Sequence, residues 1–366
     1  MPTFTVYQLV PHAPAASLVF HFGRQGIGLE ETSETLASDS LFAALVVQAA
    51  VSERETAADG GPAWAAPFVE GNPPLRHSSL LPTIGGLPLL PRPLLPLRPA
   101  TDAEVVAKQL KKLRYLSPQL FTAVCQGSSL PLQIIALQQG KVWISEAEAR
   151  QLPPPWKPAN GEPDAAWRAR LRTTPLWQVD AIPRVTLDRR SAASAYYEVG
   201  RVLFAPGAGL SILVAFTDPT AQTRFERLLT LLGESGLGGK RTNGYGAFAW
   251  RRSELTLALP GPHRRAVLLS RYIPTREELA LVRDERSTYQ FVDVGGWLLA
   301  AGGVTARRKP VMMIAEGAVL AMVDRLPSGR VIDVRPDDTV LHPIYRSGLA
   351  LAVGVPDEQT AAASGG

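Results

Sequence analysis

Two cations in a glycine-rich stretch are the residues best placed to do chemistry. Lys240 and Arg241 stand among six glycines between Gly233 and Trp250, where the sequence reads GESGLGGKRTNGYGAFAW. Glycine tolerates positive φ and carries no side chain, so its backbone N–H groups can lie close to a phosphate while the cations supply charge. A Walker phosphate loop is excluded, because Glu234 and Arg241 occupy the positions of its first glycine and of its Ser or Thr. RNA or phosphate contact and a plain solvated loop remain as alternatives.

One histidine is a second candidate for chemistry. The stretch 16–22 alternates as a strand does, with Leu18, Phe20 and Phe22 on one face and His21 on the other. An imidazole on a ligand-facing sheet surface can act as a general acid or base. The alternative is a histidine that faces solvent or a covering loop, which is the more common environment for this residue type.

Charge and cysteine usage narrow the class of protein. The formal charge is +5 and the pI is about 9.4. The cations cluster, which suits a polyanionic partner because each neutralised phosphate releases counterions; the clusters are Arg189–Arg190, Arg251–Arg252, Arg264–Arg265 and Arg307–Lys309. Cys125 is the single cysteine, so an intramolecular disulfide and a thiolate metal cage are excluded. We expect a cytoplasmic protein with no metal, because neither a signal peptide nor an apolar run of bilayer length is present.

The elements around the glycine-rich stretch predict an α+β fold. An apolar stripe of Phe225, Leu228 and Leu232 predicts a helix that Gly233 stops, and a strand resumes at Tyr245. Ser38 is placed as the N-cap of an earlier helix. Residues 199–204 and 210–216 predict a hairpin of two paired strands, and residues 184–190 predict one arm of a projecting hairpin.

Together these elements follow the order strand, helix, strand hairpin, helix, strand, which is ferredoxin-like or RRM-like. The order starts again after Pro260. We therefore expect two ferredoxin-like (RRM-like) domains, at residues 1–260 and 261–366, with long insertions at about 56–180 of the first. Within the insertions, the proline-rich stretch Leu80 to Pro99 predicts an extended apolar cover that stays out of helices and sheet interiors.

Six stretches together resemble a known family. They are SDSLFAAL at Ser38 to Leu45, SSLLP with LLPRP at Ser78 to Pro93, KKLRYLS at Lys111 to Ser117, the loop GLGGKRTNGYGAF, RKPVMMIAEGAVL at Arg308 to Leu320, and HPIYRSGLAL at His342 to Leu351. The chain resembles the fourth subunit of Csm complexes, the type III-A CRISPR-Cas interference complexes, from about Thr3 to Val355. This subunit is a RAMP protein, and RAMP proteins generally share the glycine-rich loop.

The resemblance implies a non-catalytic, RNA-binding subunit without a cofactor. Such a subunit binds the repeat-derived 5′ tag of the crRNA, contacts the large polymerase-like signature subunit and the first backbone RAMP subunit, and meets target RNA only indirectly. The implied RNA-binding residues lie in the loop, in a hairpin inserted across the guide and beside the first strands: Gly236, Gly238, Gly239, Lys240, Arg241, Thr242, Asn243, Gly244, Tyr245, Gly246, Arg184, Arg189, Arg190, His21 and Arg24. Tyr245 is expected either to stack on a base or to brace the loop.

Two other functions remain as alternatives. Some RAMP relatives are metal-independent endoribonucleases that process crRNA with a histidine in the region of His21, which would deprotonate a 2′-hydroxyl. A protein scaffold without direct RNA contact is the other, and the apolar proline-rich stretch favours it. The absence of an evident partner for His21 argues against the first, and the Lys240–Arg241 pair argues against the second.

Overall fold

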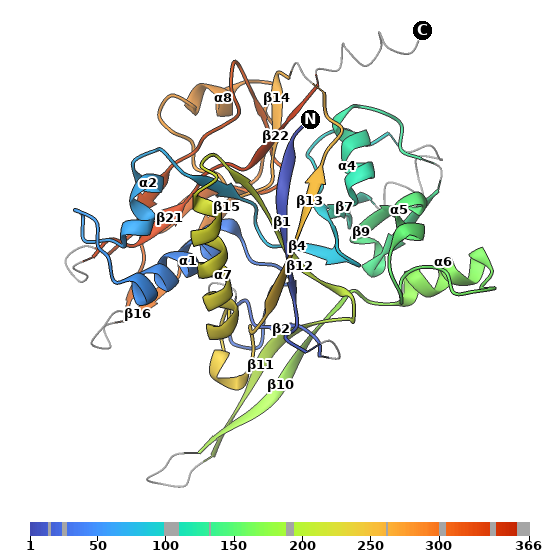
Figure 1. Cartoon of the computed structure of the whole chain (residues 1–366), viewed down its shortest axis with the longest axis horizontal. Helices are drawn as coiled ribbons and strands as arrows, with labels where there is room; N and C mark the ends of the chain where they lie inside the picture. Colours follow the sequence, from blue (N-terminus) through green and yellow to red (C-terminus); the bar gives the residue numbers. More distant parts are fainter. Residues whose placement is uncertain are drawn as a thin grey trace.

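The computed structural model shows an α+β protein made mostly of strands (Figure 1). It describes residues 1–13, 16–23, 28–98, 110–131, 133–187, 194–260, 263–299, 305–336 and 342–356. The α+β class predicted from the sequence is confirmed.

A central antiparallel sheet organises the first half of the chain. Its strands lie in the order β13 (Ala249–Thr256), β1 (Thr3–Val10), β12 (Ala208–Phe216), β4 (Leu81–Ile84) and β5 (Leu87–Pro88), and β3 (Leu75–His77) also pairs with β12. Side-chain alternation gives this sheet two buried faces. Tyr7 and Ile212 point into one apolar cluster, whereas Val6 and Leu213 point into another.

Two helices belong to the first of these clusters. They are α1 (Ser38–Glu53) and α7 (Ala221–Ser235), and both contribute buried leucines to it. With them the chain runs strand, helix, strand, strand, helix, strand. The predicted N-cap Ser38 is instead the first residue of α1, because its hydroxyl accepts the backbone N–H of Arg271 (3.0 Å) and is not free to cap.

The prediction that residues 199–204 pair with 210–216 is wrong. The first of these strands lies in β11 (Ser194–Phe204), which pairs with β10 (Trp177–Leu187) and with β2 (Val19–Phe20), in a sheet of its own. β10 and β11 form a long hairpin that projects from the body of the protein (Figure 1). The turn at 205–207 therefore connects two different sheets, in which β11 pairs with β10 and β12 pairs with β1.

The proline-rich stretch also differs from its prediction, because Leu81–Ile84 joins the central sheet as β4. Pro82 lacks an N–H, but its carbonyl accepts the N–H of Leu89 (2.8 Å), and β4 is covered on its far side by the two-residue strand β5. Proline is tolerated near a sheet edge in this way.

The remaining insertion forms a small sheet with helices. The sheet has the order β6 (Leu90–Pro91), β7 (Tyr115–Leu116), β9 (Val142–Ser145), β8 (Ile134–Leu137), and the helices beside it are α4 (Pro118–Cys125), α5 (Glu146–Gln151) and α6 (Asp164–Thr173). The short helix α2 (Ala66–Val69) lies apart from them, with Phe68 packed on Phe42 of α1. Phe121 and Leu120 of α4 are fully buried in the second apolar cluster. The insertion therefore shares a core with the central sheet.

The C-terminal part consists of short strands and one short helix. β14 (Arg265–Leu268) lies between β19 (Val319–Ala321) and β22 (Ala352–Val355), and three two-stranded sheets surround it: β15 (Phe291–Val294) with β18 (Val311–Ile314), β16 (Trp297–Leu299) with β17 (Thr305–Arg307), and β20 (Val331–Asp333) with β21 (Tyr345–Ser347). The helix is α8 (Leu279–Arg283). A second ferredoxin-like unit here stays a prediction.

Apolar and polar contacts both join the C-terminal part to the first half. Val353 and Leu351 lie in the same apolar cluster as Val6. In addition, Arg346 donates to the buried carboxylate of Asp39 at the start of α1.

Candidate nucleic-acid interface

The glycine-rich loop begins where α7 ends. The helix ends at Ser235, two residues later than predicted, and Gly236 takes positive φ. Gly233 instead lies inside the helix, where a Cβ would come within 2.1 Å of the carbonyl oxygen of Phe248. This glycine therefore permits the close packing of α7 on the chain that leaves the loop, and Phe248 donates its N–H to Gly233 (3.1 Å).

The base of the loop is fixed to β2 and to the residues after it. Gly246 donates its N–H to the carbonyl oxygen of Val19 and Gly239 donates to that of His21, both at 2.8 Å. Gly238 has φ +96° and runs so close to His21 that a Cβ would lie 2.6 Å from its carbonyl oxygen. Only glycine meets both conditions, so Gly238 determines how the loop seats.

The tip of the loop turns outward. Lys240 has φ +56° and precedes a single 3₁₀ turn at Arg241–Asn243, which is closed by the N–H of Asn243 on the carbonyl of Lys240 (2.9 Å). Residues 241–244 are exposed, whereas Leu237 and Gly246 at the base are buried. Arg241 and Thr242 are thus presented to solvent on a firmly held base.

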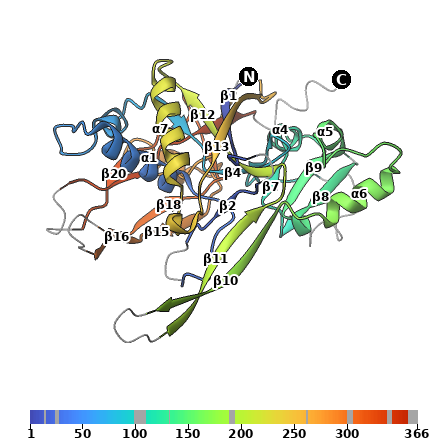
Figure 2. The ribbon, with the colours of Figure 1, turned by 60° about the horizontal axis from the view of Figure 1, so that its bottom comes forward.

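Lys240 faces the projecting hairpin. Its Nζ lies 5.2 Å from the ring centroid of Tyr197 on β11, and Tyr197 is directly opposite Arg184 on β10. The Nε of Arg184 is buried and has no hydrogen-bond partner among the described residues. Lysine, tyrosine and arginine from three segments therefore lie together where the loop meets the hairpin. Figure 2 shows the ribbon of β10 and β11 running out from β2.

Tyr245 lies below this group. Its side chain is buried, and it interacts with Arg201 of β11. A hydrogen bond to Asp180 (2.8 Å) is the main cause that raises the pKa of Arg201, and Tyr245 adds to it. A ring buried in this way is not open to a base from solvent, and bracing of the loop stays the prediction for Tyr245.

His21 is held beneath the loop. Its side chain is 4% exposed, and Nδ1 lies 2.7 Å from the carbonyl oxygen of Gly200. Because a carbonyl only accepts, Nδ1 carries the proton. A Cβ on Gly239 would touch the ring at 2.7 Å, so the loop covers the imidazole. This environment suits a histidine that positions the loop on the hairpin.

Some predicted residues lie outside the described ranges, and two neighbouring residues were missed. Arg24, Arg189 and Arg190 are in the first group. Tyr197 and Arg201 contact the loop but were not predicted as site residues. The alternation in AYYEVGR at 195–201 could have indicated them, because it puts an aromatic ring and a guanidinium on one face of a strand. The sequence alone did not show that this strand belongs to the sheet beside the loop.

The described ranges contain neither a cluster of metal-binding side chains nor a membrane-spanning helix. No cluster of three or more His, Cys, Asp or Glu side chains suited to a metal ion occurs in the described ranges. None of the helices in those ranges has the length and apolar character needed to cross a bilayer.

Comparisons with known proteins identify similar sequences and structures. The family model for the CRISPR Csm4 C-terminal domain matches residues 262–355. A curated Csm4 protein of Mycobacterium tuberculosis (strain CDC 1551 / Oshkosh) is 27% identical over 344 residues, which cover 92% of this chain and 95% of the relative. The chain is therefore similar to Csm4 proteins over nearly its whole length. A Csm4 protein of Thermococcus onnurineus is 30% identical over 182 residues, half of this chain and 55% of the relative.

Solved structures of Csm4 assemblies share the fold. A Csm3–Csm4 subcomplex of the type III-A CRISPR-Cas interference complex matches with a TM-score of 0.61 and 16% identity, over 97% of this chain and 100% of the other. A Csm1–Csm4 cassette in complex with cA4 matches with a TM-score of 0.54 and 18% identity, over 97% and 98%. The family resemblance predicted from the sequence is confirmed.

Proposed function

We propose that the chain is a non-catalytic, RNA-binding subunit of a type III-A CRISPR-Cas effector complex. In this role it binds the repeat-derived 5′ tag of the crRNA and links the large signature subunit to the backbone RAMP subunits. The observation that carries the proposal is the loop at residues 236–246, which presents Lys240 and Arg241 beside the Tyr197 and Arg184 face of the hairpin.

This arrangement suits single-stranded RNA. Single strands are bound by cations that follow the phosphates and by aromatic or guanidinium planes beside the bases. The loop supplies the exposed Arg241, the half-buried Lys240 and backbone N–H groups, and the hairpin supplies a ring and a second guanidinium. Contacts of this kind position the backbone of the strand and read little of its sequence.

The assembly role is supported by the relatives. Csm4 proteins are found in Csm1–Csm4 and Csm3–Csm4 assemblies. The strand order β13-β1-β12-β4 with two helices supports a ferredoxin-like unit in residues 1–260, and we infer a second unit in 261–366. A cytoplasmic location agrees with the use of a single, buried cysteine.

The nuclease alternative has less support. A general base must come within hydrogen-bond reach of the 2′-hydroxyl. The imidazole of His21 is buried under Gly239 and makes its hydrogen bond to the backbone of Gly200. We therefore assign His21 a positioning role.

The test is RNA retention in the co-expressed complex. The chain is expressed with the neighbouring genes of its operon and a CRISPR array, purified by a tag, and the 5′ ends of the bound RNA are sequenced. The variant Lys240→Asn/Arg241→Gln removes both charges, and asparagine tolerates the left-handed backbone of Lys240. Each lost hydrogen bond to a charged group costs about 1.5 to 3 kcal/mol, so guides with a uniform tag should be depleted.

Two controls make the result specific. Arg172→Gln/Arg276→Gln removes the same charge from exposed positions outside the loop and should retain guides. His21→Gln should yield guides with normal 5′ ends. Accumulation of unprocessed precursor in that sample would establish the nuclease instead, and guide retention in the loop variant would refute the RNA contact.

A further inference from the structure

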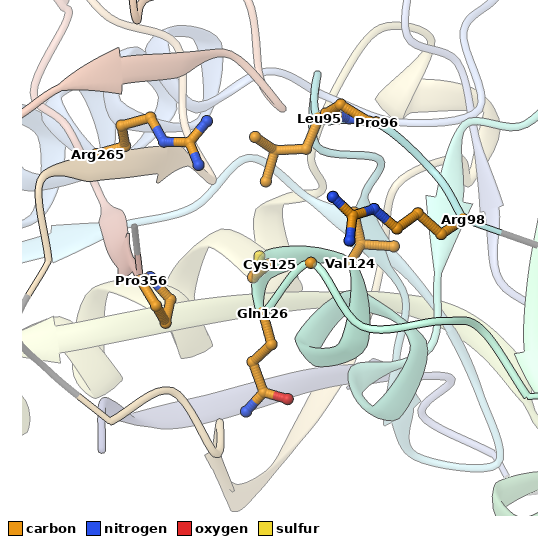
Figure 3. Close-up of a pocket in the computed structure, with 9 residues that line it drawn as sticks. Leu95, Pro96, Arg98, Val124, Cys125, Gln126, Arg265 and Pro356 are labelled. Atoms are coloured by element: carbon orange, nitrogen blue, oxygen red, sulfur yellow. The ribbon is translucent and has the colours of Figure 1, made fainter. Parts of the chain in front are cut away.

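A hollow at the other end of the molecule has the composition of an anion site. Arg98 lies between β6 and β7 of the small insertion sheet, and Arg265 begins β14. Leu95, Val124, Cys125 and Pro356 line the same hollow. The hollow is small, about 10 Å³, and its mouth is open to solvent. Figure 3 shows both guanidinium groups directed into this space from opposite sides.

The charge of the two arginines is not balanced within the described ranges. Neither arginine forms an ion pair or a side-chain hydrogen bond there, and the Nε of Arg265 is buried without a partner. Arg98 is exposed, whereas Arg265 is half-buried, and partial burial of an uncompensated charge is costly. Two guanidiniums that face one hollow therefore favour an anionic occupant.

Neighbouring groups of the hollow do not supply that negative charge. The last carbonyls of α4 point towards it, but the N–H groups of Gln126, Gly127 and Ser128 already cap them. The thiol of Cys125 stays neutral, because burial raises its pKa far above the ordinary value and Arg265 offsets this only in part. The anion must come from outside this set of residues.

The chemistry and position of the hollow favour a protein carboxylate over RNA. Guanidinium forks bind carboxylates with paired hydrogen bonds, and the apolar side chains of Leu95, Val124 and Pro356 suit the aliphatic stem of an acidic residue. The hollow is lined by Val124 and Cys125 of α4. In both ribbon views α4 lies in the upper part of the molecule and the β10–β11 hairpin, which the glycine loop contacts, projects at the bottom (Figures 1 and 2). A strand held by the loop would be far from it.

We propose that the Arg98–Arg265 hollow binds an Asp or Glu side chain of a partner subunit, carried on an apolar segment. This inference rests on the assembly role proposed above. It adds a specific interaction surface and the charge of the partner that fits it.

The test is site-specific photo-cross-linking in the purified complex. Pro96 is exposed at the rim of the hollow, and the variant Pro96→p-benzoylphenylalanine places a cross-linker there. After irradiation, mass spectrometry should find an acidic peptide of a co-purified protein subunit attached at position 96. Adding Arg98→Gln/Arg265→Gln should reduce the yield by roughly tenfold or more, since charge-assisted hydrogen bonds are lost. Adding Arg172→Gln/Arg276→Gln should leave it unchanged.

Four results would overturn the proposal. The cross-link could form to RNA, or to residues 357–366 of the same chain, which include Asp357 and Glu358. Equally, no cross-link could form at all, or the arginine variant could leave its yield unchanged. The double variant replaces the half-buried Arg265 and could therefore impair folding. In that case the single variant Arg98→Glu, at an exposed position, tests the site instead, and it should also reduce the cross-linking yield. Guide RNA and subunits in the same sample report on the assembly role. Their presence without a cross-link would refute this site alone, and their absence would refute the proposed function.

Discussion

Asp39 is the residue on which the contact between the two halves depends most. Its carboxylate is fully buried, accepts from Arg346, which is itself buried, and accepts from Arg271 Nη1 at 3.2 Å. Replacing it by Asn removes the charge and leaves the buried guanidinium of Arg346 without its carboxylate, while the partly exposed Arg271 keeps Glu316 nearby. The free energy of unfolding should fall by about 3 to 5 kcal/mol, as measured by urea denaturation.

A matched control for Asp39→Asn is Asp180→Asn. Asp180 pairs with Arg201 on the surface of the hairpin, where its side chain is 45% exposed, so its loss should cost about 0 to 1 kcal/mol. Equal effects of the two variants would show that the Asp39 cluster does not join the halves.

His77 makes stability depend on pH. Burial lowers the pKa of His77 below the ordinary 6.5, and its ring packs near Phe42 of α1. Above pH 6.5 the histidine is neutral in both states and has no effect. As the pH falls below this value, the unfolded chain takes up a proton that the folded chain refuses, so stability is lost.

The variant His77→Gln should weaken this dependence. Between about pH 7.5 and pH 5.5, the melting temperature of the wild type should fall further than that of the variant. A residual slope is expected, because burial also lowers the pKa of His263. Parallel curves for the two proteins would contradict the assignment.

At the scale of elements, two glycine variants distinguish the contact of the loop with the β2 segment from the backbone conformation of the loop itself. Gly238 and Gly244 both have positive φ, but a Cβ would meet the His21 carbonyl at position 238 and open space at position 244. Gly238→Ala should therefore displace the loop and deplete guide RNA, as removal of the two cations does. Gly244→Ala should retain most of it, at a backbone cost of about 1 kcal/mol.

Sequencing of co-purified RNA from both variants measures this difference. Equal retention would mean that the contact with His21 does not position the loop. Equal loss would mean that the backbone of the tip matters as much as the base.

The same elements show what sequence can and cannot predict. The loop, α1 and α7 depend on neighbours a few residues away, so glycine spacing and apolar periodicity predicted them. The pairing of β11 depends on β10 and on β2, which is more than 170 residues away in Val202↔Phe20, and no local pattern carries that information. Tyr197 was missed for this reason, since only the pairing brings its ring under Lys240.

At the scale of the whole molecule, the second apolar cluster predicts cooperative unfolding. It contains Phe4 and Leu213 of the central sheet together with Val267 and Val353 of the C-terminal part. Because neither half can expose its side of this cluster without cost, calorimetry should show one transition that coincides with tryptophan fluorescence and far-ultraviolet circular dichroism.

The variant Val353→Ala tests this coupling directly. It should lower the temperature of the whole transition, since a fully buried side chain is shortened in a shared core. Two separate transitions, of which Val353→Ala shifts only one, would instead support independently folding domains at residues 1–260 and 261–366. The repeated order of elements in the sequence predicted that boundary but carried no information on how much core crosses it.

The position of β1 at the centre of the sheet also has a consequence during synthesis. Both of its neighbours, β12 and β13, lie far along the chain. Roughly 200 residues separate Val10 from Ala208, so at about 5 to 20 residues per second the first strand leaves the ribosome some 10 to 40 s before either partner exists. During that interval Phe4, Val6 and Tyr7 have no sheet to join, and the nascent chain should be a client of ribosome-associated chaperones until residue 256 has emerged.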